Sequence, residues 1–277
     1  MYEKIVVPLD GSKLAEVALP YAEELGGKMG SDVTLLTVLA SADIAEYEQY
    51  YQYAEKIVEV TRYHANKYHN GSGKSVTVDT VNRTGYPAEA IMQYVSCLPF
   101  QLVVMASHGR SGVSRWAVGS VADKVVRATK SQSVMLIRAN GSRSDIREKR
   151  ILKKALVPLD GSLRSEAVIP YITKMAAKLD MELTLLQVLP QRNHSYEVAE
   201  TYLQDTCKRL ARKGVSAGYR VGLGPVADQI IDLADELALD LVAMSTRGVG
   251  SAKPWSLGSV AQKVFLGGNT PILLVKR

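Results

Sequence analysis

One stretch of the chain has glycines and a serine at a spacing that suits phosphate binding. An apolar run at 102–107 is followed by Gly109, and Gly119 and Ser120 stand ten and eleven positions further on. Glycine lets the backbone approach an anion closely, and the helix predicted to begin near Gly119 offers free amides and a partial positive charge. The Ser120 hydroxyl can also donate to a phosphate oxygen. These residues therefore predict a phosphate-binding loop after a buried strand.

A second interpretation of the serine is that it caps its own helix. Ser120 with Asp123, and Ser259 with Gln262, have the spacing of a capping box. Capping would account for each serine, but not for a glycine ten positions before Gly119 or for the polar loop between the two glycines. We therefore favour phosphate binding and keep capping as the alternative.

The same pattern recurs later in the chain with different charges around it. Three residues stand at matching positions: Gly248, Gly258 and Ser259. Arg110 and Arg115 would add positive charge to the first site, whereas Val249 replaces Arg110 and Arg247 replaces His108 in the second. We predict that the second site is electrostatically different from the first and weaker.

Ser107 and His108 raise the question of nucleophilic catalysis. A catalytic triad needs a base within hydrogen-bond reach of the nucleophile and a third group that orients the base. Neighbouring residues at a strand end are expected to point to opposite faces, and the second copy has Arg247 in place of the histidine. We predict no dedicated catalysis, and slow hydrolysis of a bound nucleotide stays open.

The segment Gly73-Lys74-Ser75 looks like the end of a P-loop. In that motif the first glycine would stand at position 68, which is Tyr68. A helix is predicted before this segment and a strand after it, which places it at the amino ends of the strands. Ligands of parallel sheets bind beyond the carboxyl ends, so we interpret the segment as a Gly/Ser turn.

The chain is an internal duplication. Residues 6–25 match 156–175 at an offset of 150, and 118–126 match 257–265 at an offset of 139. The second copy has therefore lost 11 residues between its second strand and its third helix. We predict three parts: domain 1 at 1–139, a polar linker at 140–151 and domain 2 at 152–277.

Each copy alternates short β-rich runs with helical patterns. Five strands are predicted in the first copy, at 4–9, 33–39, 75–81, 102–107 and 133–138. Helices are predicted at about 13–28, 45–69, 86–97 and 119–129, with Ser12 as the cap of the first. This order predicts an α/β fold in which each copy is a doubly wound, five-stranded parallel sheet with right-handed crossovers.

The second predicted helix is rich in tyrosine. The residues are Tyr47, Tyr50, Tyr51, Tyr53, Tyr63 and Tyr68. A tyrosine has a large apolar body and a polar tip, which suits half-buried helix faces. We interpret these side chains as packing residues rather than as a ligand site.

Composition narrows the function classes. The chain has 277 residues, 47% hydrophobic and 22% charged, and it begins with no signal-peptide pattern, so we predict a cytoplasmic protein that does not associate with membranes. Most of the net charge of +6 lies in 138–154, with seven Lys or Arg against two acidic residues, so no nucleic-acid binding is predicted. Two separate cysteines and four scattered histidines predict neither a disulfide framework nor a metal site.

The chain strongly resembles the universal stress protein family. Nucleotide-binding members carry G-x2-G-x9-G-[ST] after strand four, and both copies match from the second glycine onward, as Gly109-x9-Gly119-Ser120 and its later counterpart. The first position of the motif departs from the family pattern, with Ala106 in one copy and Ser245 in the other. The resemblance covers nearly the whole chain twice, and it implies a tandem member with a Rossmann-like fold of the adenine nucleotide alpha hydrolase type.

The resemblance implies an adenine nucleotide, ATP or AMP, with Mg²⁺ as a companion of ATP. It places the ribose near Asp10 and Asp160 and the adenine edge near Val38 and Val188, at the ends of the first and second strands of each copy. The implied binding residues of the first copy are Pro8, Asp10, Val38, Ala106, Gly109, Arg110, Gly119, Ser120 and Val121. Those of the second copy are Pro158, Asp160, Val188, Ser245, Gly248, Gly258, Ser259 and Val260.

Three functions compete on these residues. The favoured one is a nucleotide-binding stress regulator that acts through its conformation or through an unknown regulatory protein partner. The others are a dimeric scaffold that has lost nucleotide binding, and an ATP-using enzyme such as a slow ATPase. Family members dimerise through the last strand, so the resemblance also implies that the two copies form an intramolecular pseudo-dimer and leaves a homodimer open.

Overall fold

The structure is a computed structural model of the whole chain, and the chain divides into two compact units, Met1–Ile151 and Leu152–Arg277. It describes residues 2–39, 44–68, 75–97, 101–108, 118–129, 132–138, 150–191, 195–246 and 257–276. Most of the predicted linker, at 139–149, lies outside these ranges. Among the described helices, none combines the length and the apolar content needed to cross a bilayer.

The first unit is built on a parallel sheet. Its strands are β1 (Lys4–Leu9), β2 (Asp32–Leu39), β3 (Val78–Thr84), β4 (Gln101–Ala106) and β5 (Ser133–Ile137). They lie in the order β3-β2-β1-β4-β5, and each neighbouring pair runs parallel. All residues of β4 and β5 are buried, as their continuous apolar runs predict for strands covered on both faces.

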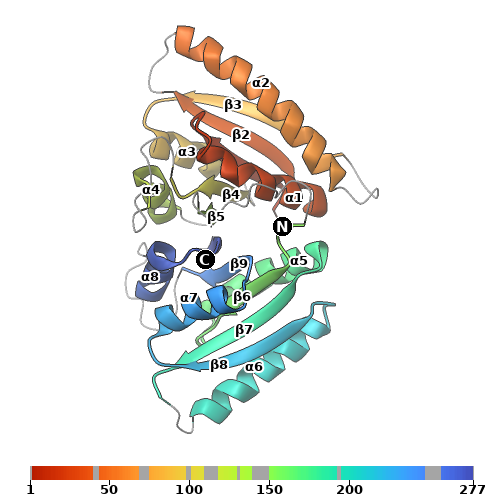
Figure 1. Cartoon of the computed structure of the whole chain (residues 1–277), viewed down its shortest axis with the longest axis vertical. Coiled ribbons are helices and arrows are strands. Elements are labelled where there is room, and N and C mark those ends of the chain that lie inside the picture. Colours follow the sequence, from red (N-terminus) through yellow and green to blue (C-terminus); the bar gives the residue numbers. More distant parts are fainter. Residues whose placement is uncertain are drawn as a thin grey trace. The chain divides into compact units, whose positions relative to one another are not determined.

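Helices connect these strands in the doubly wound pattern. They are α1 (Leu19–Met29), α2 (Ile44–Lys67), α3 (Pro87–Ser96) and α4 (Ser120–Ala128). Within this unit α1 packs against α2, and α3 packs against α4 (Figure 1). The strand order reverses between β3 and β4, so right-handed crossovers place these two helix pairs on opposite faces of the sheet. The predicted fold class is confirmed.

The second unit repeats the arrangement. Its strands are β6 (Lys154–Pro158), β7 (Glu182–Leu189), β8 (Ala217–Leu223), β9 (Leu241–Ser245) and β10 (Ile272–Val275). Their order is β8-β7-β6-β9-β10, again with parallel neighbours. Its helices are α5 (Ile169–Leu179), α6 (Ser195–Ala211), α7 (Val226–Glu236) and α8 (Ser259–Gly267).

The first predicted helix, at about 13–28, is wrong as a single element. A 3₁₀ turn spans Ala15–Ala18, and the α-helix begins only at Leu19. Pro20 is the reason, because proline has no N–H for the carbonyl four residues earlier and its ring crowds that carbonyl. At the second position of α1 the missing donor costs nothing, since the first amides of a helix have no intrahelical acceptor.

The third strand lies three residues later than predicted. It was expected at 75–81, where apolar and polar residues alternate, but it spans Val78–Thr84. Its register against β2 pairs Val33 with Val78 and Leu39 with Thr84. The strand therefore continues through polar residues for as long as β2 offers a pairing partner. β3 is an edge strand and is mostly exposed, so burial constrains its residue types weakly.

Candidate functional site

A cavity of about 340 Å³ opens in the first unit at the carboxyl edge of the sheet. The ends of β1, β2 and β4 contribute to its wall, together with the first turn of α4 and residues of α2 and α3. At this edge, β1 has β2 as its neighbour on one side and β4 on the other, so the strand order reverses there. Open α/β sheets bind ligands at such switch points, and the volume lies at the lower end of the usual range for small-molecule sites.

The structure brings most of the predicted first-copy residues to this cavity. Seven line it: Pro8, Asp10, Val38, Ala106, Gly119, Ser120 and Val121. They come from three strand ends and one helix start, which are far apart in the sequence. The predicted residues Gly109 and Arg110 lie outside the described residues, as does Arg115.

The first turn of α4 presents its backbone rather than a cap. Gly119 is the N-cap residue, with φ −58° and ψ 144°, and no described side chain bonds to this helix start. Its N–H donates to the Ser107 carbonyl at 2.7 Å, and the Asp123 N–H donates to the Gly119 carbonyl at 3.0 Å. Ser120 is therefore the first helical residue, and its side chain is exposed.

The capping-box interpretation of Ser120 is consequently wrong. A capping serine stands one position before the helix, whereas here Gly119 takes that position. The carboxylate of Asp123 does not reach back to the helix start either, because both of its oxygens accept from Arg127 Nε at 2.9 Å. Among the described residues, no side chain caps the start of α4, and Gly119, Ser120 and Val121 line the cavity.

Gly119 is needed because the start of α4 approaches the end of β4 closely, and not because its backbone angles are unusual. A Cβ at this position would lie 3.0 Å from the Ser107 carbonyl oxygen and 3.4 Å from the Cα of His108. Any side chain would push the helix start away from the end of β4. The glycine therefore lets the first turn of α4 lie directly against the strand end.

The turn after β1 holds Asp10 in one orientation. Its Oδ1 accepts from the Ser12 N–H at 3.0 Å and from the Ser12 hydroxyl at 2.6 Å. The Ser12 Oγ accepts in turn from the N–H of Ala15, the first residue of the 3₁₀ turn, at 3.2 Å. Contrary to the prediction, Ser12 therefore does not cap an α-helix. Gly11 has φ +79°, which the tight turn requires. The carboxylate is thus placed in the cavity wall by its own loop.

Ser107 and His108 contact each other, which the sequence reasoning did not expect. Ser107 Oγ lies 3.0 Å from His108 Nδ1, and both residues are buried. The prediction that they point to opposite faces is wrong, because the chain has left β4 at Ala106 and strand alternation no longer applies. Within the described residues His108 Nε2 has no hydrogen-bond partner, so no third group of a triad orients the imidazole there.

Several residues of the cavity were not predicted. Leu36 on β2, Ile91 on α3 and Met105 on β4 supply apolar wall, and their apolar character alone could not distinguish wall from core. Tyr50 on α2 also lines the cavity, and its hydroxyl donates to the Asp10 carbonyl at 3.2 Å. The half-buried position of Tyr50 agrees with a packing residue, and its place in the cavity wall was not predicted.

The corresponding residues of the second unit lie at the matching ends of its elements. Pro158 ends β6 and Val188 lies near the end of β7, while Ser245 ends β9. Gly258 is the N-cap of α8, with its N–H donating to the Thr246 carbonyl at 2.8 Å. Ser259 is exposed at the first helical position and Val260 follows it, so the capping interpretation fails here too. Gly248 and Arg247 lie outside the described residues.

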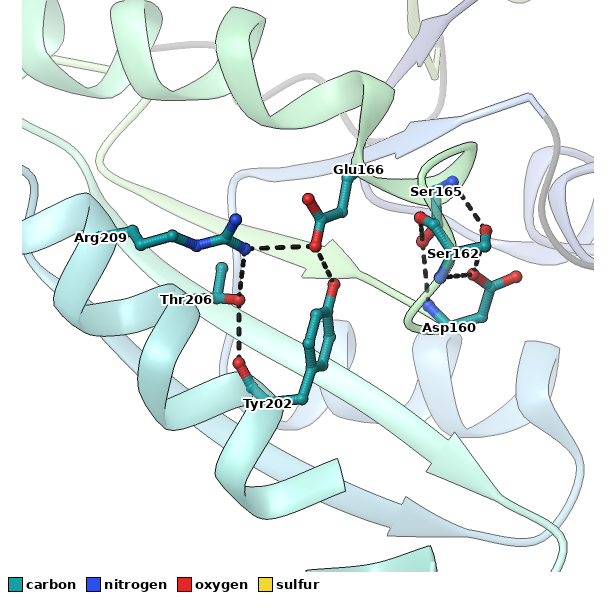
Figure 2. Close-up of polar contacts among 7 residues, drawn as sticks. All are labelled: Asp160, Ser162, Ser165, Glu166, Tyr202, Thr206 and Arg209. Carbon is teal, nitrogen blue, oxygen red and sulfur yellow. Dashed lines mark hydrogen bonds and ion pairs between the residues drawn. The ribbon is translucent and has the colours of Figure 1, made fainter. Parts of the chain in front are cut away.

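The turn after β6 repeats the aspartate–serine bonds of its counterpart, and Ser165 adds two further hydrogen bonds (Figure 2). Asp160 Oδ1 accepts from the Ser162 N–H at 3.0 Å and from its hydroxyl at 2.6 Å. Ser165 Oγ accepts from the Asp160 N–H at 3.2 Å and donates to the Ser162 carbonyl at 2.9 Å. Alanine stands at the matching position of the first unit, so the two turns differ in this serine.

A tyrosine ties each turn to the long helix beside it. Tyr202 on α6 donates to Glu166 Oε1 at 2.8 Å, and Arg209 contacts the same oxygen at 3.2 Å (Figure 2). In the first unit Tyr53 on α2 donates to Glu16 Oε1 at 3.1 Å. Burial, and then the neighbouring glutamate, raises the pKa of both tyrosines above the ordinary value.

The fold and this site define a tandem α/β protein in which helix starts meet the carboxyl ends of parallel strands. The family model described as the universal stress protein family matches residues 1–138 and again 152–276. The chain therefore belongs to the universal stress protein family.

Individual relatives agree with this assignment. Universal stress protein YxiE of Bacillus subtilis is 26% identical over 148 residues, which cover 46% of this chain and 100% of that protein. Universal stress protein MJ0531 of Methanocaldococcus jannaschii is 27% identical over 143 residues, covering 46% and 84%. The crystal structure of a universal stress protein from Archaeoglobus fulgidus has a TM-score of 0.72 at 18% identity, covering 99% of this chain and 96% of that one. At that identity the likeness shows the fold alone.

Proposed function

We propose that the first unit binds an adenine nucleotide, ATP or AMP, in the cavity at the carboxyl edge of its sheet. The observation that carries the proposal is the start of α4, where amides and an exposed serine without a capping role face a cavity of suitable size. Free helix amides and the helix dipole favour an anionic group at this position. The phosphates would lie there, against Gly119, Ser120 and Val121.

The remaining wall suits a nucleoside. Asp10, held by its loop, offers a carboxylate that can accept hydrogen bonds from ribose hydroxyls. Apolar side chains of β2 and α3, Leu36, Val38 and Ile91, would contact the base. A cavity with phosphate-binding amides at one side and apolar wall at another matches the amphipathic character of a nucleotide.

We propose regulation through conformation or a protein partner as the output, in the cytoplasm, with no dedicated catalysis. The buried contact between Ser107 and His108 resembles part of a catalytic triad, but Ser107 is only 1% exposed. A nucleophile in that position cannot meet a substrate without movement of the chain. The bond that holds the end of β4 against the start of α4 is a separate one, from the Gly119 N–H to the Ser107 carbonyl.

Magnesium would enter with ATP rather than occupy a protein site. The described residues contain no group of three His, Cys, Asp or Glu side chains able to hold a metal ion. Mg²⁺ prefers phosphate oxygens and water with one or two carboxylates. Asp10 is a carboxylate in the cavity wall, and its Oδ1 is already engaged by Ser12.

The experiment is mass analysis of nucleotide retained by the purified full chain, followed by calorimetric titration with ATP and AMP. We expect a retained or titratable adenine nucleotide that GTP and inorganic phosphate at equal concentration do not displace. No retention, together with no heat of binding at millimolar ATP and AMP, would sink the proposal and favour the scaffold function.

A further inference from the structure

Tyr50 is an aromatic residue in the cavity wall to which the proposed nucleotide binding assigns no contact. Tyr50 lies on α2, the helix that follows β2, and it lines the cavity together with Pro8, Leu36 and Val38. Its hydroxyl donates to the Asp10 carbonyl at 3.2 Å. This bond reaches from α2 to the turn after β1 and fixes the far end of the ring.

We propose that the Tyr50 ring contacts the nucleobase and that this contact distinguishes the first nucleotide site from the second. This contact rests on the proposed function and adds Tyr50 as a residue that contacts the base. Val38 and Leu36, from the strand whose end would meet the base, line the same wall as Tyr50. An aromatic ring beside that wall offers a flat apolar surface to a purine.

The ring is prepared for such a contact before the ligand arrives. A tyrosine side chain has two main rotatable bonds, and the hydrogen bond to Asp10 anchors its tip. Little side-chain entropy remains to be lost on binding, and preorganised groups contribute more to affinity for that reason. Stacking of a base on an aromatic ring also tolerates different ring substituents, since every base has a π-face.

The second unit lacks this group. The matched tyrosines Tyr53 and Tyr202, each bonded to a glutamate of the turn, align α2 with α6 at an offset of 149. Tyr50 then corresponds to Ala199, which is 2% exposed and has only a methyl group. The same helix position thus carries a ring in one unit and none in the other.

The test compares two substitutions of Tyr50 in the full chain. Tyr50→Phe and Tyr50→Leu both remove the hydroxyl and its bond to Asp10, but only phenylalanine keeps the ring. Calorimetric titration with AMP should give a loss of about 5- to 100-fold for Tyr50→Leu. Tyr50→Phe keeps the ring and loses only its anchoring bond, so its loss of affinity should be much smaller. Equal affinities of the two variants would overturn the proposal.

A matched control separates ring contact from a general effect on α2. Tyr63 lies on the same helix with 68% of its surface exposed, away from the cavity-lining residues. Tyr63→Leu should leave AMP affinity unchanged, and thermal unfolding shows whether each variant is folded. An equal loss in Tyr63→Leu would mean that α2 acts as a whole, which contradicts the proposal.

A measurement on the unmutated chain covers the case in which Tyr50→Leu does not fold. Intermolecular NOEs should connect the Tyr50 ring protons with H2 or H8 of bound AMP. If AMP binds but these NOEs are absent, the Tyr50 contact is refuted while nucleotide binding stands. If the wild-type chain binds neither AMP nor ATP, the proposed function fails first.

Discussion

At the scale of single residues, Ser120 shows how a local pattern can support two opposite structures. Serine followed three residues later by an acidic residue is typical of a capping box. The structure instead gives the cap position to Gly119 and leaves Ser120 exposed at the first helical position. The preceding glycine, rather than the serine, determines this geometry. The Gly119 N–H donates to the Ser107 carbonyl at 2.7 Å, and the Cβ of any other residue would lie too close to the same oxygen.

Replacing Ser120 with alanine should weaken nucleotide binding without weakening the fold. A hydroxyl bonded to a charged phosphate contributes about 1–2 kcal/mol, or roughly a 5- to 30-fold change in affinity. Because no capping bond is lost, the melting temperature of the free chain should stay unchanged. Calorimetric titration measures the nucleotide affinity, and thermal unfolding measures the melting temperature. A lower melting temperature with unchanged affinity would restore the capping interpretation.

Gly119→Ala should cost both affinity and stability. The added Cβ would lie 3.0 Å from the Ser107 oxygen, so the start of α4 must move away from β4. We expect no measurable nucleotide binding at the first site in Gly119→Ala or in Gly119→Val, and a larger loss of stability in Gly119→Val. Lys74→Ala is the control: Lys74 lies outside the described residues, and the sequence predicts it in a Gly/Ser turn at the amino ends of the strands. Loss of ATP binding in Lys74→Ala would move the site elsewhere.

At the scale of elements, long apolar runs were predictable and their ends were less so. β1 has the predicted bounds of 4–9, because an uninterrupted apolar run between polar turns has one way to be buried. The start of α1 depended on where Pro20 fell within a helical pattern. The bounds of β3 depended on its partner β2, and pairing on an exposed edge leaves little trace in residue type.

The tyrosine links between turn and helix make a prediction about alkaline pH. Tyr53→Phe and Tyr202→Phe each remove one hydrogen bond to a glutamate, at a cost of about 1 kcal/mol at neutral pH. Burial and the glutamates raise the pKa of both tyrosines, so the folded chain keeps these protons when the unfolded chain loses them near pH 10.

The contribution of these tyrosines is therefore complete below about pH 10 and falls as the pH rises above it. Urea unfolding at pH 7, 9 and 11 measures the effect. The wild-type chain should lose stability across this range more steeply than either Tyr→Phe variant. Tyr63→Phe, which alters an exposed residue, should keep the wild-type slope. Parallel slopes for all four proteins would contradict the assignment of these bonds.

At the scale of the whole molecule, the strand order explains why residues singled out in the sequence meet at one cavity. Seven predicted residues from separate elements line one cavity, because the motif after β4 and the turn after β1 meet wherever a parallel sheet reverses its strand order. Tyr50 was not predictable, since its ring reaches the cavity from a helix whose packing only the folded unit defines. The contact between Ser107 and His108 depended on the chain direction after β4, which no residue pattern encodes.

The differences between the copies predict two unequal nucleotide sites in one chain. The second unit has Ala199 at the position of Tyr50, and its sequence has Val249 at the position of Arg110. Calorimetric titration of the full chain with ATP should show one tighter site, followed by a weaker site or none. Gly119→Ala should remove the tighter event, whereas Gly258→Ala should leave it intact. Loss of the tighter event only in Gly258→Ala would reverse the ranking.

The uncapped start of α4 has a consequence for the protein without its ligand. In the proposed nucleotide complex, a phosphate would take the place that a capping side chain has in other helices. The amides of Ser120, Val121 and Ala122 should exchange quickly with solvent deuterium in the free chain and slowly when nucleotide is bound. Nucleotide binding would then change the order of the first turn of α4, and a partner protein could recognise the ordered turn.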